Sequence, residues 1–169
     1  YIAYNVYSSH CSSHSYDIYM GSIMITIRIL CVGNLKEKFW IDCAEEYKKR
    51  LGRFCKLQII EVAEQNKYQD IEKIKKVEGE ELLGQLSGKN ILLDIKGQEY
   101  TSEEFALKLQ NIMQTNSIVT FVIGGSYGCS EDVRKNIKDK LSFGKATYPH
   151  NLARIILLEQ IYRAFMINS

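Results

Sequence analysis

The chain has 169 residues and a formal net charge of +2, with 46% hydrophobic and 25% charged residues. This composition is typical of a globular protein, and the length suits one domain with a single sizeable core. No apolar run of about eighteen residues occurs, so we expect no membrane-spanning helix, and the near-neutral charge neither indicates nor excludes nucleic-acid binding.

The first segment, residues 1–23, differs from the rest of the chain. It is rich in serine and tyrosine and shows neither helical nor strand periodicity. It also lacks the basic start and apolar centre of a signal peptide. We interpret it as a non-native or disordered leader before a domain over residues 24–169. A zinc site of His10, Cys11 and His14 is a weaker alternative, because their spacing matches no closed four-ligand pattern.

In the first half of the domain, strand-like segments alternate with helical ones. Residues 24–32 are β-branched and apolar, as in a buried strand, and residues 36–51 place apolar side chains at helical spacing. Residues 56–63 predict a second strand, and residues 71–86 an amphipathic helix. Residues 90–96 predict a third strand, closed by the glycine that follows it.

The second half continues this alternation. Residues 103–114 predict a helix, and residues 117–123 form a fully apolar strand. Residues 131–141 predict a charged helix, and residues 141–148 a strand end or an ordered loop. Residues 151–167 predict a final helix that is apolar on more than one face.

The alternation indicates an α/β fold in one domain, with a mainly parallel sheet and helices on both faces. The final helix is more apolar than a solvent-facing helix of a monomer would be. Surplus apolar surface of this kind usually lies at a partner interface, so we expect a homodimer.

The cysteines of the domain lie inside apolar segments and form no close pair. We therefore expect buried free thiols in a reducing cytoplasm rather than a disulfide framework. These residues are Cys31, Cys43, Cys55 and Cys129. A catalytic cysteine paired with His150 is a weaker alternative.

A glycine-rich segment, Gly124–Gly128, directly follows the strand at 117–123 and precedes a helix. Ligands of α/β sheets gather at the carboxyl ends of strands, and glycines let the backbone approach them closely. The segment fits neither a Walker loop nor G-x-G-x-x-G, which disfavours ordinary dinucleotide binding. From the pattern alone, a ligand-binding turn and a purely structural turn are equally plausible.

The segment LSFGKATYPH, residues 141–150, is a nearly uncharged loop that can present backbone groups to a planar ligand. His150 could be an acid/base group, an RNA contact or a helix-start residue satisfied by the backbone. In the final helix, Arg154 could hold a phosphate. Glu159 precedes Arg163 by four residues, which permits a simple ion pair.

Three motifs, IGGSYG, LSFGKATYPH and EQIYRAF, occur in this order. With them, residues 24–167 resemble the ribosomal RNA large subunit methyltransferase H family of the SPOUT superfamily. The resemblance begins at ITIRILCVGNLKEKFW and includes EGEELL and ILLDIKGQEYTSEEFA. It implies a C-terminal deep trefoil knot and a functional homodimer; the alternation of elements alone predicts no knot.

The resemblance also implies S-adenosylmethionine as the cofactor, with no metal. By position in the family's motifs, the cofactor pocket includes Leu93 and Gly124, together with a stretch that contributes mainly backbone groups. That stretch consists of Phe143, Gly144, Lys145, Ala146, Thr147 and Tyr148.

The implied reaction is methylation of N3 of a pseudouridine in 23S ribosomal RNA, within the assembled ribosome in the cytoplasm. A sulfonium is a good leaving group, so positioning can supply much of the acceleration, and a nearby group can assist loss of the N3 proton. The candidates are His150, Arg154 and Glu159, with Arg154 favoured as an anchor for phosphate or a uracil carbonyl.

The family's short C-terminal Pro-Tyr-His-basic tail has no counterpart in Asn168 and Ser169, the last residues of this sequence. The first alternative, which this difference favours, is a non-catalytic ribosome- or RNA-binding module of the same fold. A second alternative is a SPOUT methylase with another RNA target.

Overall fold

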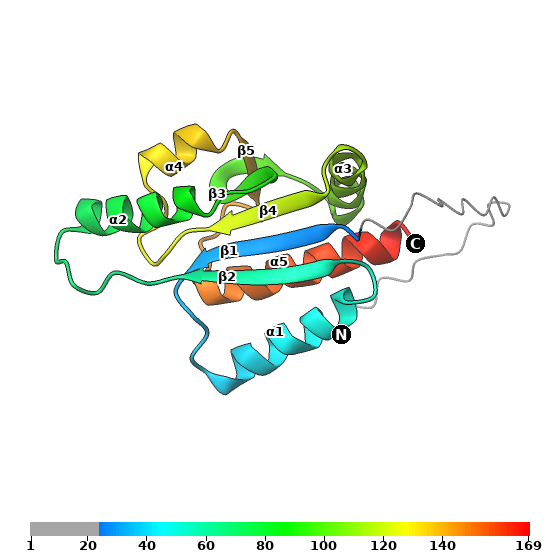
Figure 1. Ribbon diagram of the computed structural model, residues 1–169, viewed down its shortest axis with the longest axis horizontal. Helices are drawn as coiled ribbons and strands as arrows, with labels where there is room; N and C mark the ends of the chain where they lie inside the picture. The colour runs from blue at the N-terminus through cyan, green and yellow to red at the C-terminus, as the bar shows by residue number, and fades with distance from the viewer. Residues whose placement is uncertain (1–23) are drawn as a thin grey trace, which may run out of the picture.

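The computed structural model describes residues 24–169, which fold around one five-stranded sheet (Figure 1). Strands and helices alternate along this part of the chain. The strands are β1 (Thr26–Val32), β2 (Lys56–Val62), β3 (Lys89–Glu99), β4 (Ile118–Ile123) and β5 (Asp139–Ser142). The helices are α1 (Lys38–Leu51), α2 (Ile71–Gly84), α3 (Ser102–Thr115), α4 (Glu131–Asn136) and α5 (His150–Ile167).

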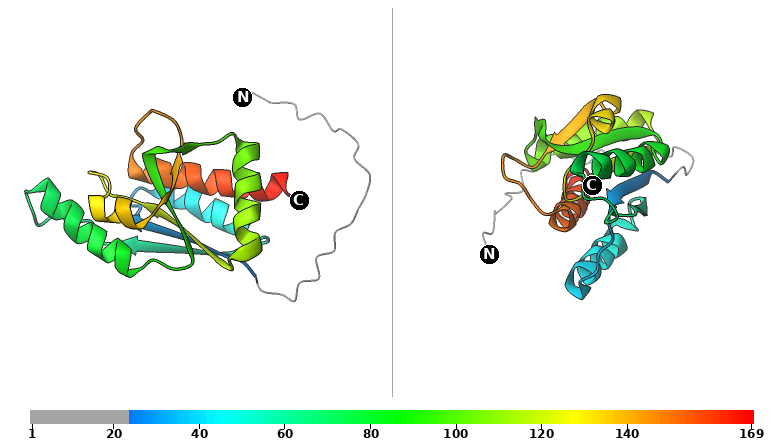
Figure 2. Two further views of the ribbon diagram at one scale, coloured as in Figure 1. Left: turned by 90° about the horizontal axis from the view of Figure 1, so that it is seen from above. Right: turned by 90° about the vertical axis from the view of Figure 1, so that its left-hand side faces the viewer.

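The sheet has the strand order β2-β1-β4-β3-β5, and every neighbouring pair is parallel. Parallel neighbours need crossover connections, which place helices on the faces of the sheet. Helices α2 and α4 cover one face, while α1, α3 and α5 lie on the other (Figures 1 and 2). The predicted α/β class, with a parallel sheet and helices on both faces, is confirmed.

Each face of the sheet carries its own hydrophobic core, because successive side chains of a strand point to opposite sides. Ile29 and Phe121 pack in the core beneath α1, α3 and α5. Leu30 and Val122, one position further along the same strands, pack in the core beneath α2 and α4. This explains why the central strands are apolar throughout rather than alternating.

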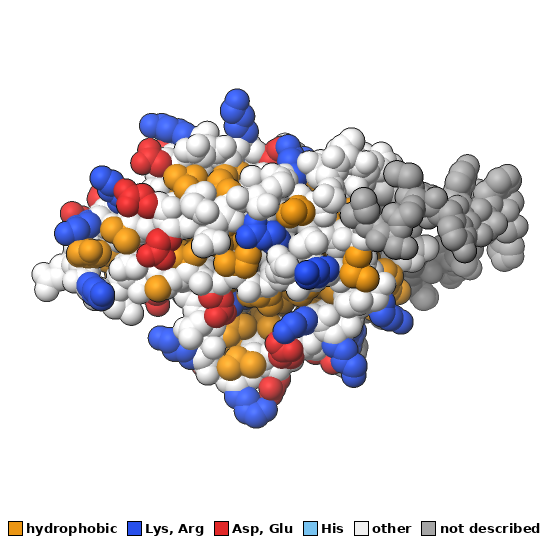
Figure 3. Space-filling model, in the orientation of Figure 1, with side chains coloured by type: hydrophobic (Ala, Val, Ile, Leu, Met, Phe, Trp, Pro, Cys, Tyr) orange, Lys and Arg blue, Asp and Glu red, His pale blue; other side chains and the backbone are white. Residues whose placement is uncertain are grey.

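Much of the apolar surface of α5 is buried within the chain. Tyr162 packs against Tyr47 of α1. Phe165 packs against Phe54, which follows α1, and the two rings stack with centroids 5.3 Å apart. Figure 3 shows hydrophobic side chains in the band between the sheet and α1. The composition of α5 is thus largely explained within one chain. The homodimer stays a prediction.

The third strand does not end before Gly97, as the sequence indicated. β3 runs on to Glu99 and shifts its register against β5 between Leu93 and Gln98. A Cβ atom on Gly97 would lie 2.6 Å from the carbonyl carbon of Leu141. The glycine therefore permits close approach of the neighbouring strand instead of ending its own.

The charged helix predicted over 131–141 is wrong in its second half. α4 begins after Ser130, whose hydroxyl oxygen accepts the N–H of Val133 at 3.3 Å, and it ends at Asn136. Residues 139–142 instead form β5, which pairs with β3. Pairing within the sheet overrides the local helical pattern here.

Two expectations are not tested by this architecture. The strand order does not by itself establish a trefoil knot, which stays a prediction. The proposed leader, residues 1–23, and the alternative zinc site of His10, Cys11 and His14 lie outside the described residues.

Candidate functional site

A cavity of about 830 Å³ lies at the carboxyl ends of β4 and β5, beside Leu93, Asp94 and Ile95 in the middle of β3. It is bounded by the glycine turn (Gly124–Gly128), the loop of residues 143–149 and the start of α5. This is the edge at which parallel α/β sheets bind ligands. The predicted site residues that line it are Leu93, Gly124, Phe143, Gly144, Ala146, Thr147, Tyr148 and His150.

The glycine turn has a compact geometry that side chains would disrupt. The N–H of Gly128 donates to the carbonyl of Gly125 at 2.9 Å, and Gly128 has φ of +78°. A Cβ atom on Gly124 would lie 2.6 Å from Sγ of Cys129. The turn therefore requires glycine at these positions for structural reasons. The same glycines also leave its backbone open to close approach by a ligand.

The 143–149 loop is shaped by Ser142, a buried residue at the end of β5. The N–H of Gly144 donates to Oγ of Ser142, and the Ser142 hydroxyl donates to the carbonyl of Gly144, both at 3.1 Å. Gly144 has φ of +108°, and among the described residues no heavy atom beyond its chain neighbours lies within 4 Å of its Cβ position. The loop thus presents backbone to an open part of the cavity.

An ion pair that the sequence did not reveal also lines the cavity. Nε of Arg134, in α4, donates to Oδ2 of Asp94 at 2.7 Å, and the Asp94 side chain is only 4% exposed. Burial raises the pKa of Asp94, but the N–H of Lys96 and the Arg134 guanidinium outweigh it, so the net pKa is lowered. The cavity therefore contains an ionised carboxylate beside a guanidinium.

His150 begins α5 and lies half-buried at the cavity. A Cβ atom on Gly33, at the end of β1, would lie 3.3 Å from its Nε2 atom. Burial lowers the pKa of His150, the carboxylate of Glu64 raises it in part, and Arg154 lowers it further. A neutral imidazole at this wall can accept a proton or a hydrogen bond.

Arg154 does not line the cavity. Its side chain is 1% exposed, and Nη1 donates to Oε1 of Glu61, at the end of β2, at 2.7 Å. Nη2 donates to the carbonyl of Gly33, also at 2.7 Å. This arginine therefore binds α5 to the ends of β1 and β2 and holds the helix start, including His150, in place.

Two further predicted residues, Glu159 and Lys145, also lie outside the cavity. Nε of Arg163 donates to Oε1 of Glu159 at 2.9 Å, which is the simple ion pair that the spacing permitted. Lys145 is exposed on the 143–149 loop and is not among the lining residues. Within one described chain, only His150 of the three catalytic candidates reaches the cavity.

Three cysteines of the described residues are buried free thiols, as predicted, whereas Cys43, which was also expected to be buried, is only partly so. Burial raises the pKa of Cys31 to about 11 and that of Cys55 and Cys129 to about 12, so these thiols are poor nucleophiles. Residues 24–169 contain no group of three metal-ligating side chains. In the same part of the chain, no helix is long and apolar enough to cross a membrane.

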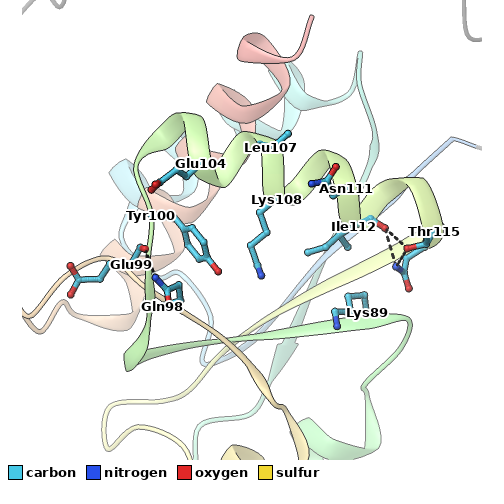
Figure 4. Close-up of a pocket in the computed structure, with 11 residues that line it drawn as sticks. Lys89, Gln98, Glu99, Tyr100, Glu104, Leu107, Lys108, Asn111, Ile112 and Thr115 are labelled. Carbon is cyan, nitrogen blue, oxygen red and sulfur yellow. Dashed lines mark hydrogen bonds between the residues drawn. The ribbon is translucent and has the colours of Figure 1, made fainter.

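A second cavity, of about 700 Å³, lies beside α3 and β3 (Figure 4). Several of its polar side chains already have partners, inside or beside the cavity. The Lys108 amine lies 5.3 Å from the centroid of the Tyr100 ring, Glu104 accepts the N–H of Thr101, and Lys89 pairs with Asp139. The cavity at the carboxyl ends of β4 and β5 is therefore the stronger candidate site.

The comparison with known families agrees with this geometry. Residues 25–169 match the family described as predicted SPOUT methyltransferase, and the match includes every element of the sheet and of the cavity. The chain belongs to the SPOUT methyltransferase family.

Curated relatives with a more specific name are similar to this chain over most of its length. A protein of Lactobacillus delbrueckii subsp. bulgaricus named ribosomal RNA large subunit methyltransferase H is 48% identical over 153 residues, covering 86% of this chain and 96% of the relative. Proteins of the same name from Lactobacillus helveticus and Latilactobacillus sakei are 47% and 45% identical, with the same coverage.

Proposed function

We propose that this chain is an S-adenosylmethionine-dependent methyltransferase that methylates N3 of a pseudouridine in 23S ribosomal RNA. The observation that carries the proposal is the cavity at the carboxyl ends of β4 and β5, built from the glycine turn and the 143–149 loop in a SPOUT family chain. The relatives' name, which specifies large-subunit ribosomal RNA, supports the substrate class.

The cavity suits the chemical parts of S-adenosylmethionine. Its volume of about 830 Å³ is in the range of small-molecule pockets. Leu93 and Ile123 are apolar lining residues that suit the adenine ring, and the loop backbone can satisfy its polar edge. The ionised carboxylate of Asp94 suits a cationic part of the cofactor, and Arg134 suits its carboxylate.

When bound, the cofactor would supply a methyl group on a sulfonium, which departs as a neutral thioether. The chain's own contribution is mainly positioning. The glycine turn and the loop that Ser142 holds provide rigid walls, and His150 at the cavity can accept the N3 proton. Arg154 acts on this site only through the helix that carries His150.

We further propose that the enzyme acts as a homodimer on the assembled ribosome, in the cytoplasm. Exposed apolar side chains support self-association, including Phe39 at 62% and Met166 at 47% exposed. Basic residues of α1 pair with acidic neighbours, as Lys38 does with Asp42, so this helix is not a strongly basic RNA surface. Recognition of a large assembled particle fits the small net charge of +2.

The proposal is tested by methyl transfer to ribosomes from a strain that lacks this modification, with a labelled methyl donor. We expect label in 23S ribosomal RNA. Ala146→Phe adds bulk at the cavity wall and should weaken cofactor binding, measured by calorimetry, at least about tenfold. The matched variant Lys145→Phe changes the neighbouring residue, which does not line the cavity, and should bind as the wild type does.

The outcomes separate the competing functions. Ribosome association without label transfer would favour a non-catalytic binding module. Label on a different nucleotide would indicate a SPOUT methylase with another RNA target. If the wild type binds no S-adenosylmethionine, or if Ala146→Phe binds it equally well, the assignment of the cavity is wrong.

A further inference from the structure

Glu78, in the middle of α2, is a buried carboxyl group that the proposed reaction does not use. The residue is 2% exposed, and its Oε1 atom accepts the N–H of Gln65 at 2.9 Å. Its Oε2 atom is buried and has no hydrogen-bond partner among residues 24–169. An ionised carboxylate in this place would be strongly unfavourable. The presence of a glutamate here therefore needs an explanation.

The unpartnered oxygen lies against the wall of the candidate cofactor cavity. A Cβ atom on Gly125 would lie 2.7 Å from Oε2 of Glu78, so the glycine turn packs directly on the carboxyl group. The next residue, Ser126, donates to Oε1 of Glu64 at 3.0 Å, and Glu64 precedes Gln65. Glu78 therefore contacts both the glycine turn and the segment after β2.

The position of Glu78 is fixed by the glycine that follows it. A Cβ atom on Gly79 would lie 2.4 Å from Oγ of Ser130 and 3.2 Å from Cγ2 of Val133. Ser130 is the N-cap of α4, which follows the glycine turn along the chain. In the EGEELL motif, Glu78 thus packs on Gly125 and Gly79 packs on Ser130. Together they hold α2 against the glycine turn at one end and the start of α4 at the other.

We propose that Glu78 is a positioning residue that maintains the binding shape of the glycine turn, and that it does so in its uncharged, protonated form. This inference rests on the proposed function, because the turn is a wall of the proposed cofactor cavity. Glu78 is not among the residues that line the cavity and acts through Gly125.

The groups that face Glu78 favour its uncharged form. Burial raises the pKa of Glu78, the N–H of Gln65 lowers it in part, and the carboxylates of Glu64 and Glu81 raise it further. The titratable group facing it from the end of the glycine turn is Cys129, a neutral thiol whose pKa burial raises to about 12. No ion pair found within residues 24–169 includes Glu78.

Ionisation would therefore place an unpaired charge against the glycine turn, and the turn must move or admit water to solvate it. A ligand that requires the packed turn then binds the protonated protein more tightly. By linkage, its affinity falls as the pH rises through the raised pKa of Glu78.

The test is calorimetry of S-adenosylmethionine binding to the wild type, Glu78→Gln and Glu80→Gln between about pH 5 and about pH 9. Glutamine keeps the size of the side chain but cannot ionise. Glu80 is exposed on the same helix and provides the matched control. We expect wild-type and Glu80→Gln affinity to fall about tenfold or more with rising pH, and this fall to be absent from Glu78→Gln. Titration of His150 is common to all three proteins, so it cancels in the comparison.

If Glu78→Gln and the wild type give superimposable pH profiles, Glu78 has only a packing role and the inference is wrong. Failure of the wild type to bind at any pH would instead overturn the proposed function. Should Glu78→Gln not fold, Gly125→Ala perturbs the same contact from the turn. Because Gly125 also lines the cavity, the pH profile decides: an affinity that no longer falls with rising pH would support the inference, and a folded Gly125→Ala protein with the wild-type pH profile would overturn it.

Discussion

At the residue scale, the buried side chain of Arg154 fixes the position of the start of α5. Its guanidinium donates to Glu61 and to the carbonyl of Gly33, while its Nε atom is buried and finds no partner in the described part of the chain. These contacts join the start of α5 to the ends of β1 and β2. Removing the guanidinium leaves two acceptors without their donor, which is more costly than losing an exposed ion pair.

We predict that Arg154→Met destabilises the protein by about 2–4 kcal/mol in urea unfolding. Arg163→Met is the matched control, because Arg163 is on the same helix in a pair with Glu159 but has a 53% exposed side chain. Its expected cost is below about 1 kcal/mol. Equal costs for the two variants would contradict the role assigned to Arg154.

The Asp94–Arg134 pair gives a prediction that depends on pH. The pKa of Asp94 is lower in the folded protein than its ordinary value, so its stabilising contribution is present above the unfolded pKa of about 3.9 and is lost as the pH falls through the folded value. Asp94→Asn should therefore cost about 1–2 kcal/mol at neutral pH and much less in strong acid, measured by urea unfolding.

Asp42→Asn is the control for this measurement, because Asp42 pairs with Lys38 on the exposed face of α1 with 60% of its side chain accessible. Its effect should be small at every pH. A cost for Asp94→Asn that does not diminish in acid would show that the ion pair is not its source.

At the scale of elements, hydrophobic periodicity predicted the order and type of most strands and helices. It failed where a tertiary contact decided the outcome: Gly97 lies inside β3 because β5 approaches it, and residues 139–142 pair as a strand. Tertiary contacts that periodicity cannot predict also form part of the candidate site. Asp94 and Arg134 are 40 positions apart and come together only in the folded sheet. Family motifs indicated the glycine turn and the 143–149 loop, but periodicity alone did not.

Gly97→Ala should disturb both the sheet and the site. Its Cβ atom would collide with the backbone of Leu141, next to the Ser142 that shapes the 143–149 loop. We expect a cost of about 1–3 kcal/mol in thermal or urea unfolding, together with weaker cofactor binding. Gly84→Ala should show neither effect, because its Cβ atom would meet no described heavy atom within 4 Å beyond the nearby backbone of its own helix. Normal cofactor binding by Gly97→Ala would contradict the proposed coupling of β5 to the cavity.

At the scale of the whole molecule, one chain does not bring all the catalytic candidates to the cavity. His150 lines the cavity, whereas Glu159 pairs with Arg163 outside it. We expect a second copy of the chain to cover exposed apolar side chains such as Phe39 and Met166. The homodimer is therefore part of the proposed function.

Sedimentation equilibrium tests this assembly. We predict a species of twice the 19.5 kDa chain mass at micromolar concentration, because burial of the exposed apolar side chains favours association. A single-chain mass over the whole concentration range would contradict the dimer.

The central claim, methylation of one pseudouridine at N3, is tested most directly by mass mapping of 23S ribosomal RNA. Ribosomes from a strain that lacks the modification are incubated with the protein and S-adenosylmethionine, and the digested nucleosides are compared with synthetic standards. We expect the mass of one added methyl group on a single pseudouridine, co-migrating with the N3-methyl standard, and its loss with Ala146→Phe. A folded, cofactor-binding protein that leaves 23S ribosomal RNA unmodified, or that methylates another position, would contradict it.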